Sequence, residues 1–136
     1  MLVKDVMTKD VITIDSNKTI LDAYRLYRDN KVGSLVVTDS DKCIGIVTER
    51  DLIEKAIDKD LKTTLVKDIM TSNIRTVSPS DNLDTASEIM EKYKIKKLPV
   101  LYDNNITGII TINDIVHTRP EMTKKYIEIW IKSRWK

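Results

Sequence analysis

The stretch VKDVMT at residues 3–8 returns as VKDIMT at residues 66–71, with one conservative change. When the chain is shifted by 63 residues, it overlays itself without a gap over 51 positions, and 14 of those pairs are identical. A gap-free match of this length indicates an internal repeat, which decides the fold before any other feature is considered. We therefore predict two copies of one unit, at residues 1–62 and 63–119, followed by a basic, aromatic tail at 120–136.

Both copies show the same order of hydrophobic patterns. Short apolar runs predict strands and residues with helical spacing predict helices, with turn-forming residues between the last two strands of each copy. The expected strands are 11–14, 34–37 and 43–47, then 74–77, 98–101 and 106–110. The expected helices are 19–30 and 49–57, then 82–93 and 112–117. A copy of about 55 residues buries too little surface to be stable alone. The predicted fold class is therefore α/β (α+β), with two pseudo-twofold related strand-helix-strand-strand-helix repeats whose sheets pack together.

Composition excludes several classes of function. One cysteine and one histidine leave no disulfide, no zinc pair and little for a catalytic triad, and three glycines cannot build a phosphate-binding loop. We therefore expect no enzyme, no metal site and no cofactor. No apolar run approaches the roughly 18 residues of a membrane span, and the N-terminus lacks the apolar core of a secretion signal. The expected compartment is the cytoplasm.

The most specific repeated element is GIVTERD at 45–51 and GIITIND at 108–114. Each places Gly, two aliphatic residues, Thr and Asp at a strand-to-helix junction, where unpaired N–H groups favour anions. The glycines would let a backbone or a ligand approach closely. Thr48 with Asp51, and Thr111 with Asp114, also have the spacing of a helix capping box. The capping and ligand-binding interpretations are compatible, and both stay open at this point.

These motifs together resemble a tandem pair of cystathionine-β-synthase (CBS) domains, over about residues 1–120. The resemblance rests on VKDVMT and VKDIMT, the strands around Thr13 and Thr76, KIKKLPV at 94–100, and the two Gly-x-x-Thr-x-x-Asp segments. It implies a regulatory module that binds adenosine-containing ligands, commonly AMP, ADP, ATP or S-adenosylmethionine, in clefts between the repeats. It also implies an unidentified protein partner that the module regulates.

The resemblance assigns ligand contacts residue by residue. Asp51 and Asp114 would bind ribose hydroxyls, and Thr48 and Thr111 would bind ribose or phosphate oxygens. Backbone at Ile12–Thr13 and Arg75–Thr76 would hold the adenine edge.

The two copies differ where phosphates would lie. The first copy has Arg50 beside its aspartate, with Gly33 and Ser34 on the preceding segment. The second copy has Asn113 in place of Arg50, and Lys96 and Lys97 in place of Gly33 and Ser34. We expect two unequal sites, with Arg50 as the better candidate for a phosphate because a guanidinium fork suits one. Lys96 and Lys97 could equally be solvated surface residues.

Two further expectations concern assembly. Such pairs commonly dimerise through their helices, and we expect a homodimer with apolar contacts drawn from Leu52, Ile53, Ala56, Ile115 and Val116. In the tail, Pro120 should end the preceding helix, and a new helix should pack Tyr126, Ile127, Trp130 and Ile131 on the repeats or across the dimer. Because residues 117–136 carry six Lys or Arg residues, two Glu and both tryptophans, a nucleic-acid-binding function stays a less favoured alternative.

Overall fold

The chain forms two compact units whose boundaries differ from those of the sequence repeats. The computed structural model describes residues 1–124, 126 and 127. One unit, here called the first-repeat unit, comprises Val11–Ile74. The other, the second-repeat unit, combines Met1–Asp10 with the chain from Arg75 onward. The segment that opens the first sequence repeat therefore folds with the second repeat.

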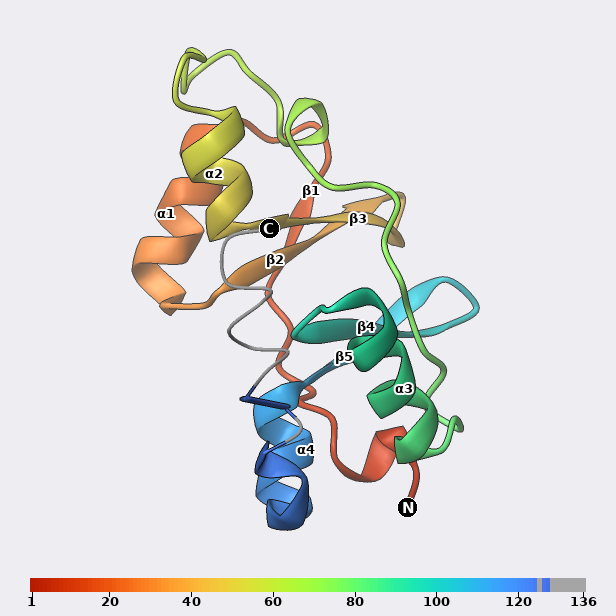
Figure 1. Ribbon diagram of the computed structural model, residues 1–136. Coiled ribbons are helices and arrows are strands. Elements are labelled where there is room, and N and C mark those ends of the chain that lie inside the picture. The colour runs from red at the N-terminus through yellow and green to blue at the C-terminus, as the bar shows by residue number, and fades with distance from the viewer. Residues whose placement is uncertain (125, 128–136) are drawn as a thin grey trace. The chain divides into compact units, whose positions relative to one another are not determined.

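The first-repeat unit contains a three-stranded sheet with two helices (Figure 1). Its elements are β1 (Thr13–Asp15), α1 (Ile20–Asn30), β2 (Ser34–Asp39), β3 (Lys42–Thr48), α2 (Glu49–Lys55) and the short 3-10 helix η2 (Val66–Asp68). The strand order is β1-β2-β3, with β1 parallel to β2 and β2 antiparallel to β3. The β2–β3 hairpin turns at Ser40 and Asp41, whose φ angles of 51° and 65° are those of a tight hairpin turn.

The second-repeat unit repeats this plan. Its elements are η1 (Val3–Asp5), α3 (Leu83–Tyr93), β4 (Lys97–Tyr102), β5 (Asn105–Thr111), α4 (Ile112–Thr118) and η3 (Pro120–Met122). β4 and β5 form an antiparallel hairpin that turns at Asp103 and Asn104, again with positive φ angles. The predicted α/β (α+β) class and the strand-helix-strand-strand-helix order of the first repeat are confirmed. The expected packing of the two sheets against each other stays a prediction.

The strand expected at residues 74–77 is reduced to a single parallel bridge between Val77 and Val100. In the first-repeat unit, the N–H groups of Val36 and Ser16 extend the β1–β2 ladder at its two ends, by donating to Ile12 and Thr38. The equivalent positions in the second repeat are Pro99 and Pro79, which have no N–H to donate. The strand prediction for 74–77 was therefore wrong, because two prolines remove the flanking bonds.

The two copies of the opening segment each add a short antiparallel contact to a hairpin. Thr71 and Ile46 exchange both backbone hydrogen bonds, at 2.9 and 3.0 Å, and Thr8 and Ile109 do the same at 2.8 and 2.9 Å. The residue before each of these strand positions is a repeated glycine. A Cβ on Gly45 would lie 2.8 Å from both the Met70 Sδ and the Thr71 carbonyl oxygen, so no side chain fits there. The repeated glycines thus accommodate protein backbone, one of the two roles predicted for them.

Each unit has its own hydrophobic core, built largely from equivalent positions of the repeat. In each core, residues from the opening segment, the first helix, both hairpin strands and the second helix pack together. The equivalent buried pairs are Val3/Val66, Ile14/Val77, Ile20/Leu83, Ala23/Ala86, Leu35/Leu98, Val37/Val100, Val47/Ile110 and Leu52/Ile115. Because Val3 lies in the second-repeat core and Val66 in the first-repeat core, each opening segment is an integral part of the unit that it joins.

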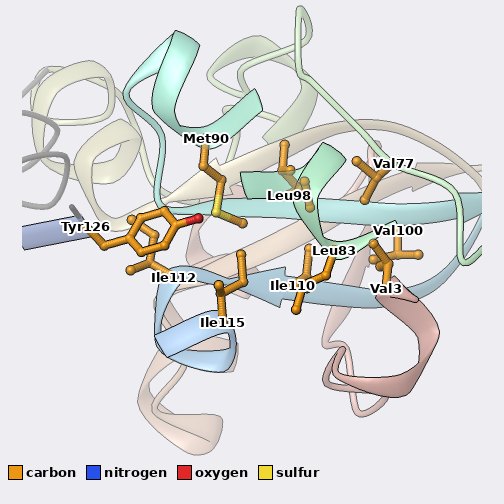
Figure 2. Close-up of a cluster of buried hydrophobic side chains, with 11 residues drawn as sticks. Val3, Val77, Leu83, Met90, Leu98, Val100, Ile110, Ile112, Ile115 and Tyr126 are labelled. Atoms are coloured by element: carbon orange, nitrogen blue, oxygen red, sulfur yellow. The ribbon is translucent and has the colours of Figure 1, made fainter. Parts of the chain in front are cut away.

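The tail contributes one residue to the second-repeat core. Tyr126 is 1% exposed, and Figure 2 shows its ring at one end of the cluster, near Ile112 and Met90. Its hydroxyl hydrogen-bonds the Ser87 hydroxyl, and burial raises the pKa of Tyr126 to about 12. Ser87 stands where the first repeat has Tyr24, so the smaller side chain leaves room for the tail tyrosine.

The expectation for the tail is confirmed for Tyr126 alone. Pro120 follows α4, which ends at Thr118, and the described residues after η3 are helical. Ile127 is 52% exposed, so it does not pack on its own repeats: it lies beside Tyr126 in the helix but on another face. The alternative, that Ile127 packs across a dimer, stays a prediction. Trp130 and Ile131 lie outside the described residues.

We predict that Tyr126→Ala lowers the free energy of unfolding by about 3 kcal/mol, because it leaves a ring-sized cavity in the core. Tyr126→Phe keeps the ring and should cost about 1 kcal/mol for the lost hydrogen bond. Urea unfolding followed by circular dichroism measures both, with Ile127→Ala as the exposed neighbouring control. A loss for Tyr126→Ala no larger than that of the control would contradict the docking of the tail.

Candidate functional site

The candidate residues of the first repeat gather at one end of its sheet. Ser34 opens β2 and pairs with Thr48, which closes β3 and precedes α2. The carbonyl oxygen of Ile12, just before β1, accepts a 3.1 Å hydrogen bond from Val36, two residues beyond Ser34. Thr13 pairs with Val36, and Gly33 is the exposed residue before β2. The topology thus brings together the predicted adenine-edge and ribose residues of the first repeat.

Asp51 is a buried carboxylate within a helix cap. Its Oδ2 accepts 3.0 and 3.2 Å hydrogen bonds from the backbone N–H and the hydroxyl of Thr48. The Thr48 hydroxyl in turn accepts from the Asp51 N–H at 3.2 Å, which completes the predicted capping box. Asp51 is only 5% exposed, so these contacts are well shielded from water.

Two contacts of Asp51 were missed by the motif-based prediction. The hydroxyl of Thr71 lies 3.2 and 3.3 Å from the two carboxylate oxygens, and the ammonium of Lys55 lies 2.9 Å from Oδ1. Lys55 is four residues beyond Asp51, so helical spacing could have found it. Thr71 belongs to the repeated VKDIMT segment, but a repeat by itself does not indicate which side chain Thr71 contacts.

Arg50 lies beside this cap and is only partly paired. Its Nε donates to Glu54 at 3.1 Å, across one turn of α2. Its Nη1 is shielded from solvent and has no hydrogen-bond partner in the described part of the chain. A shielded, unpaired N–H group costs free energy that an acceptor oxygen would recover.

Tyr27 contacts the end of β3, just before the start of α2. Its hydroxyl donates to the carbonyl oxygen of Val47, next to Thr48. Burial raises the pKa of Tyr27, and the nearby carboxylates Glu49 and Asp51 raise it further. Tyr27 is therefore a neutral packing residue, which supports the position of the cap.

The second repeat places its candidate residues in the same way. Lys97 opens β4 and pairs with Thr111, and the Ile112 N–H donates to the carbonyl oxygen of Lys96 at 2.9 Å. Thr111 caps α4, with its hydroxyl accepting from the Asp114 N–H at 3.1 Å and its own N–H donating to Asp114 Oδ2 at 2.9 Å. Asn113 is exposed in the first turn of α4.

Arg75 and Thr76 lie on the segment that leads to the Val77 bridge, and both are exposed. The Arg75 guanidinium lies 4.0 Å from the centre of the Tyr93 ring, which holds that side chain against the end of α3. Because Pro99 has no N–H, the carbonyl oxygen of Arg75 lacks the bond that its equivalent Ile12 receives.

The two carboxylates therefore differ although their motifs match. Asp114 is half-buried, and among the described residues its Oδ1 has no hydrogen-bond or ion-pair partner. Its equivalents of Lys55 and Thr71 are Thr118 and Thr8. The Thr118 hydroxyl donates to the backbone carbonyl oxygen of Asp114, at 3.1 Å, instead of to the carboxylate.

Other kinds of site find no support in the described residues. They contain no cluster of three or more His, Cys, Asp or Glu residues that could hold a metal ion. Within that same part of the chain, every helix is too short or too polar to span a membrane. Cys43 lies half-buried in β3, and burial raises the pKa of its thiol, which is unlike a reactive cysteine.

We predict that Asp51→Ala destabilises the protein more than Asp114→Ala. The first change leaves Thr71, Lys55 and the Thr48 N–H without an acceptor and should cost about 2–3 kcal/mol. The second removes one cap bond and should cost about 1 kcal/mol. Urea unfolding of both variants tests this difference, and equal losses would contradict the unequal packing of the two carboxylates.

Comparison with known proteins agrees with this arrangement. A family model for the CBS domain matches residues 3–58 and 66–121. The chain is 44% identical over 118 residues to a homoserine O-acetyltransferase of Methanobrevibacter ruminantium, covering 85% of this chain but only 24% of that enzyme. It is 32% identical to the CBS domain-containing protein YhcV of Bacillus subtilis, covering 83% of this chain and 81% of YhcV.

A solved structure extends the agreement to the fold. The CBS domain pair of protein MJ0100, in complex with 5′-methylthioadenosine and S-adenosyl-L-methionine, superposes with a TM-score of 0.78 at 32% identity. The match covers 90% of this chain and 98% of that one. The chain belongs to the CBS domain family and is a tandem pair of CBS domains.

Proposed function

We propose that this chain is a regulatory module that binds AMP, ADP or ATP and transmits the bound state to a partner protein. The observation that carries the proposal is the carboxylate of Asp114, held by a helix cap at the end of a sheet with one oxygen unpaired among the described residues. A carboxylate in this state can accept the hydrogen bonds of two neighbouring ribose hydroxyls. Such charge-assisted bonds contribute about 1.5–3 kcal/mol each.

The backbone near Arg75 supports recognition of adenine. The amino group of adenine is a hydrogen-bond donor and needs an acceptor. In the second repeat, the Arg75 carbonyl oxygen is left without a strand partner by Pro99, whereas the equivalent oxygen of Ile12 is already bonded to Val36. The Arg75 carbonyl oxygen, which has no hydrogen-bond partner within the described part of the chain, is therefore a better candidate for the adenine edge than its equivalent in the first repeat.

Arg50 supports recognition of phosphate in the first repeat. Its Nη1 is shielded and unpaired in the described chain, while its Nε is held by Glu54. A phosphate oxygen would satisfy this N–H and add a charge-assisted bond. In the second repeat, Lys96 and Lys97 at the start of β4 are the corresponding candidates, opposite Thr111.

S-adenosylmethionine is the second candidate ligand, because the MJ0100 domain pair was solved with this compound and with 5′-methylthioadenosine. Both share the adenosine group that the Asp114 carboxylate and the Arg75 carbonyl oxygen would bind. The two candidates differ at the phosphate positions, so Arg50 and the lysine pair distinguish them. The similarity to the acetyltransferase extends over a quarter of that enzyme, and we propose a binding role and no catalysis for this chain.

The ligand proposal predicts a rise in melting temperature with AMP, ADP or ATP. A ligand at a hundred times its Kd adds about 2.7 kcal/mol of stability, because it binds the native state alone. Thermal-shift measurements should compare these nucleotides with S-adenosylmethionine and single-stranded RNA. The double variant Asp51→Ala/Asp114→Ala should lose the shift, while Asp58→Ala, an exposed aspartate beyond α2, should keep it. A shift with RNA alone would favour the nucleic-acid alternative, and an unchanged shift in the double variant would overturn the ribose assignment.

A homodimer stays part of the proposal, with a smaller set of contact residues than expected. Leu52, Ala56 and Ile115 are buried within their own units and are unavailable for a partner, which corrects the expectation for them. Ile53 and Ile57, in and just after α2, are 58% and 76% exposed.

We predict that light scattering at micromolar concentration gives the mass of a dimer, and that Ile53→Lys shifts it toward the monomer, because a buried unpaired charge disfavours association. Tyr102→Lys, at an exposed residue at the end of β4, is the matched control. A wild-type monomer would rule out the dimer.

A further inference from the structure

We propose that Lys55 competes with an adenosine ligand for the Asp51 carboxylate of the first repeat. The ligand would therefore bind the second repeat, at Asp114, before it binds the first. This inference rests on the proposed adenosine-binding function. It adds a residue that controls occupancy and lies outside the repeated motif.

The acceptor capacity of Asp51 is already used. A carboxylate offers about four lone-pair sites. Four donors approach Asp51: the Thr48 N–H at 3.0 Å, the Thr48 hydroxyl at 3.2 Å, the Thr71 hydroxyl at 3.2 Å and the Lys55 ammonium at 2.9 Å. Two ribose hydroxyls would find no free acceptor site there. A ligand hydroxyl can bind Asp51 only if at least one of these donors is displaced.

Lys55 is the donor that can leave. Thr48 is fixed by its cap, and the Thr71 backbone is fixed by its two hydrogen bonds to Ile46. The Lys55 side chain is 45% exposed and can move into water. Its departure has a cost, however, because the Asp51 side chain is only 7% exposed and a shielded carboxylate needs its counter-charge. Lys55 therefore acts as an internal competitor of the ligand.

Asp114 carries no such competitor in the described chain. One donor, the Thr111 N–H, approaches its Oδ2, and the other oxygen is available. The residue equivalent to Lys55 is Thr118, whose hydroxyl is bonded to a backbone carbonyl oxygen. In the same Thr-x-x-Asp motif, the carboxylate of the first repeat is thus occupied by four donors, whereas that of the second repeat has an oxygen available among the described residues. The residue that makes the difference lies four positions beyond the aspartate in both repeats.

The test is a reciprocal exchange of the two equivalent residues. Titration calorimetry with AMP and with 5′-methylthioadenosine, which has no phosphate, should be done on the wild type, Lys55→Thr, Lys55→Met and Thr118→Lys. Parallel titrations in the Asp51→Ala and Asp114→Ala backgrounds assign each affinity to a repeat. Lys55→Met keeps most of the aliphatic stem without the charge, which separates the charge effect from any loss of helix packing.

The tighter site of the wild type should disappear in Asp114→Ala. Lys55→Thr and Lys55→Met should tighten the Asp51 site about tenfold, as expected when one charge-assisted competitor is lost. Thr118→Lys should weaken the Asp114 site by a similar factor. Thermal melts of each variant confirm that it is folded.

Three results would overturn the inference. If the Asp51 site is unchanged without the lysine charge, Lys55 does not compete. If that site becomes weaker, Lys55 is itself a ligand contact. If the wild type shows two equal sites, the repeats are not distinguished, although the proposed function stands. Absence of binding in every variant would instead refute the proposed function, and this inference with it.

Discussion

The structure depends on one backbone contact that occurs in both units. In each, the threonine of a Met-Thr dipeptide exchanges two backbone hydrogen bonds with the residue that follows a glycine in a hairpin strand. Ile46 with Thr71, and Ile109 with Thr8, each exchange both bonds. The contact requires a glycine because the sulfur of the methionine occupies the space of a Cβ. It also ties the segment that opens each sequence repeat to the hairpin of the other repeat. The Met-Thr pair recurs in both copies of the segment, and both copies make this same contact.

This contact also shapes the candidate site. By pairing Thr71 with Ile46, it brings the Thr71 hydroxyl to the Asp51 carboxylate. The same pairing places Thr8 beside Ile109, but there no hydrogen bond between Thr8 and Asp114 is present among the described residues. A shared backbone geometry thus supports two different side-chain environments. The difference depends on residues that the repeat does not preserve, with Lys55 replaced by Thr118.

Much of the fold followed from the sequence because repetition doubles the evidence for each element. The hairpins, the four helices and the caps at Thr48 and Thr111 were predicted within a few residues. The strand at 74–77 was not, since the effect of Pro99 depends on which strand it faces, and strand pairing is a long-range property. The exchange of the opening segments was missed for the same reason: the repeat shows that residues correspond, but not which copy they pack against.

The residues of the candidate site could be predicted from their motif, but the hydrogen-bond partners of the two aspartates could not. Residue type and spacing identified Asp51 and Asp114 as equals, whereas their hydrogen bonds depend on neighbours that the motif does not include. The tail shows the same principle in the core. Ser87 replaces Tyr24 within the repeat, and Tyr126, from outside it, supplies the missing ring. In a duplicated chain, substitutions that break the repeat therefore mark where one copy has acquired a different contact. Here they mark both the docking of the tail and the proposed difference between the two ligand sites.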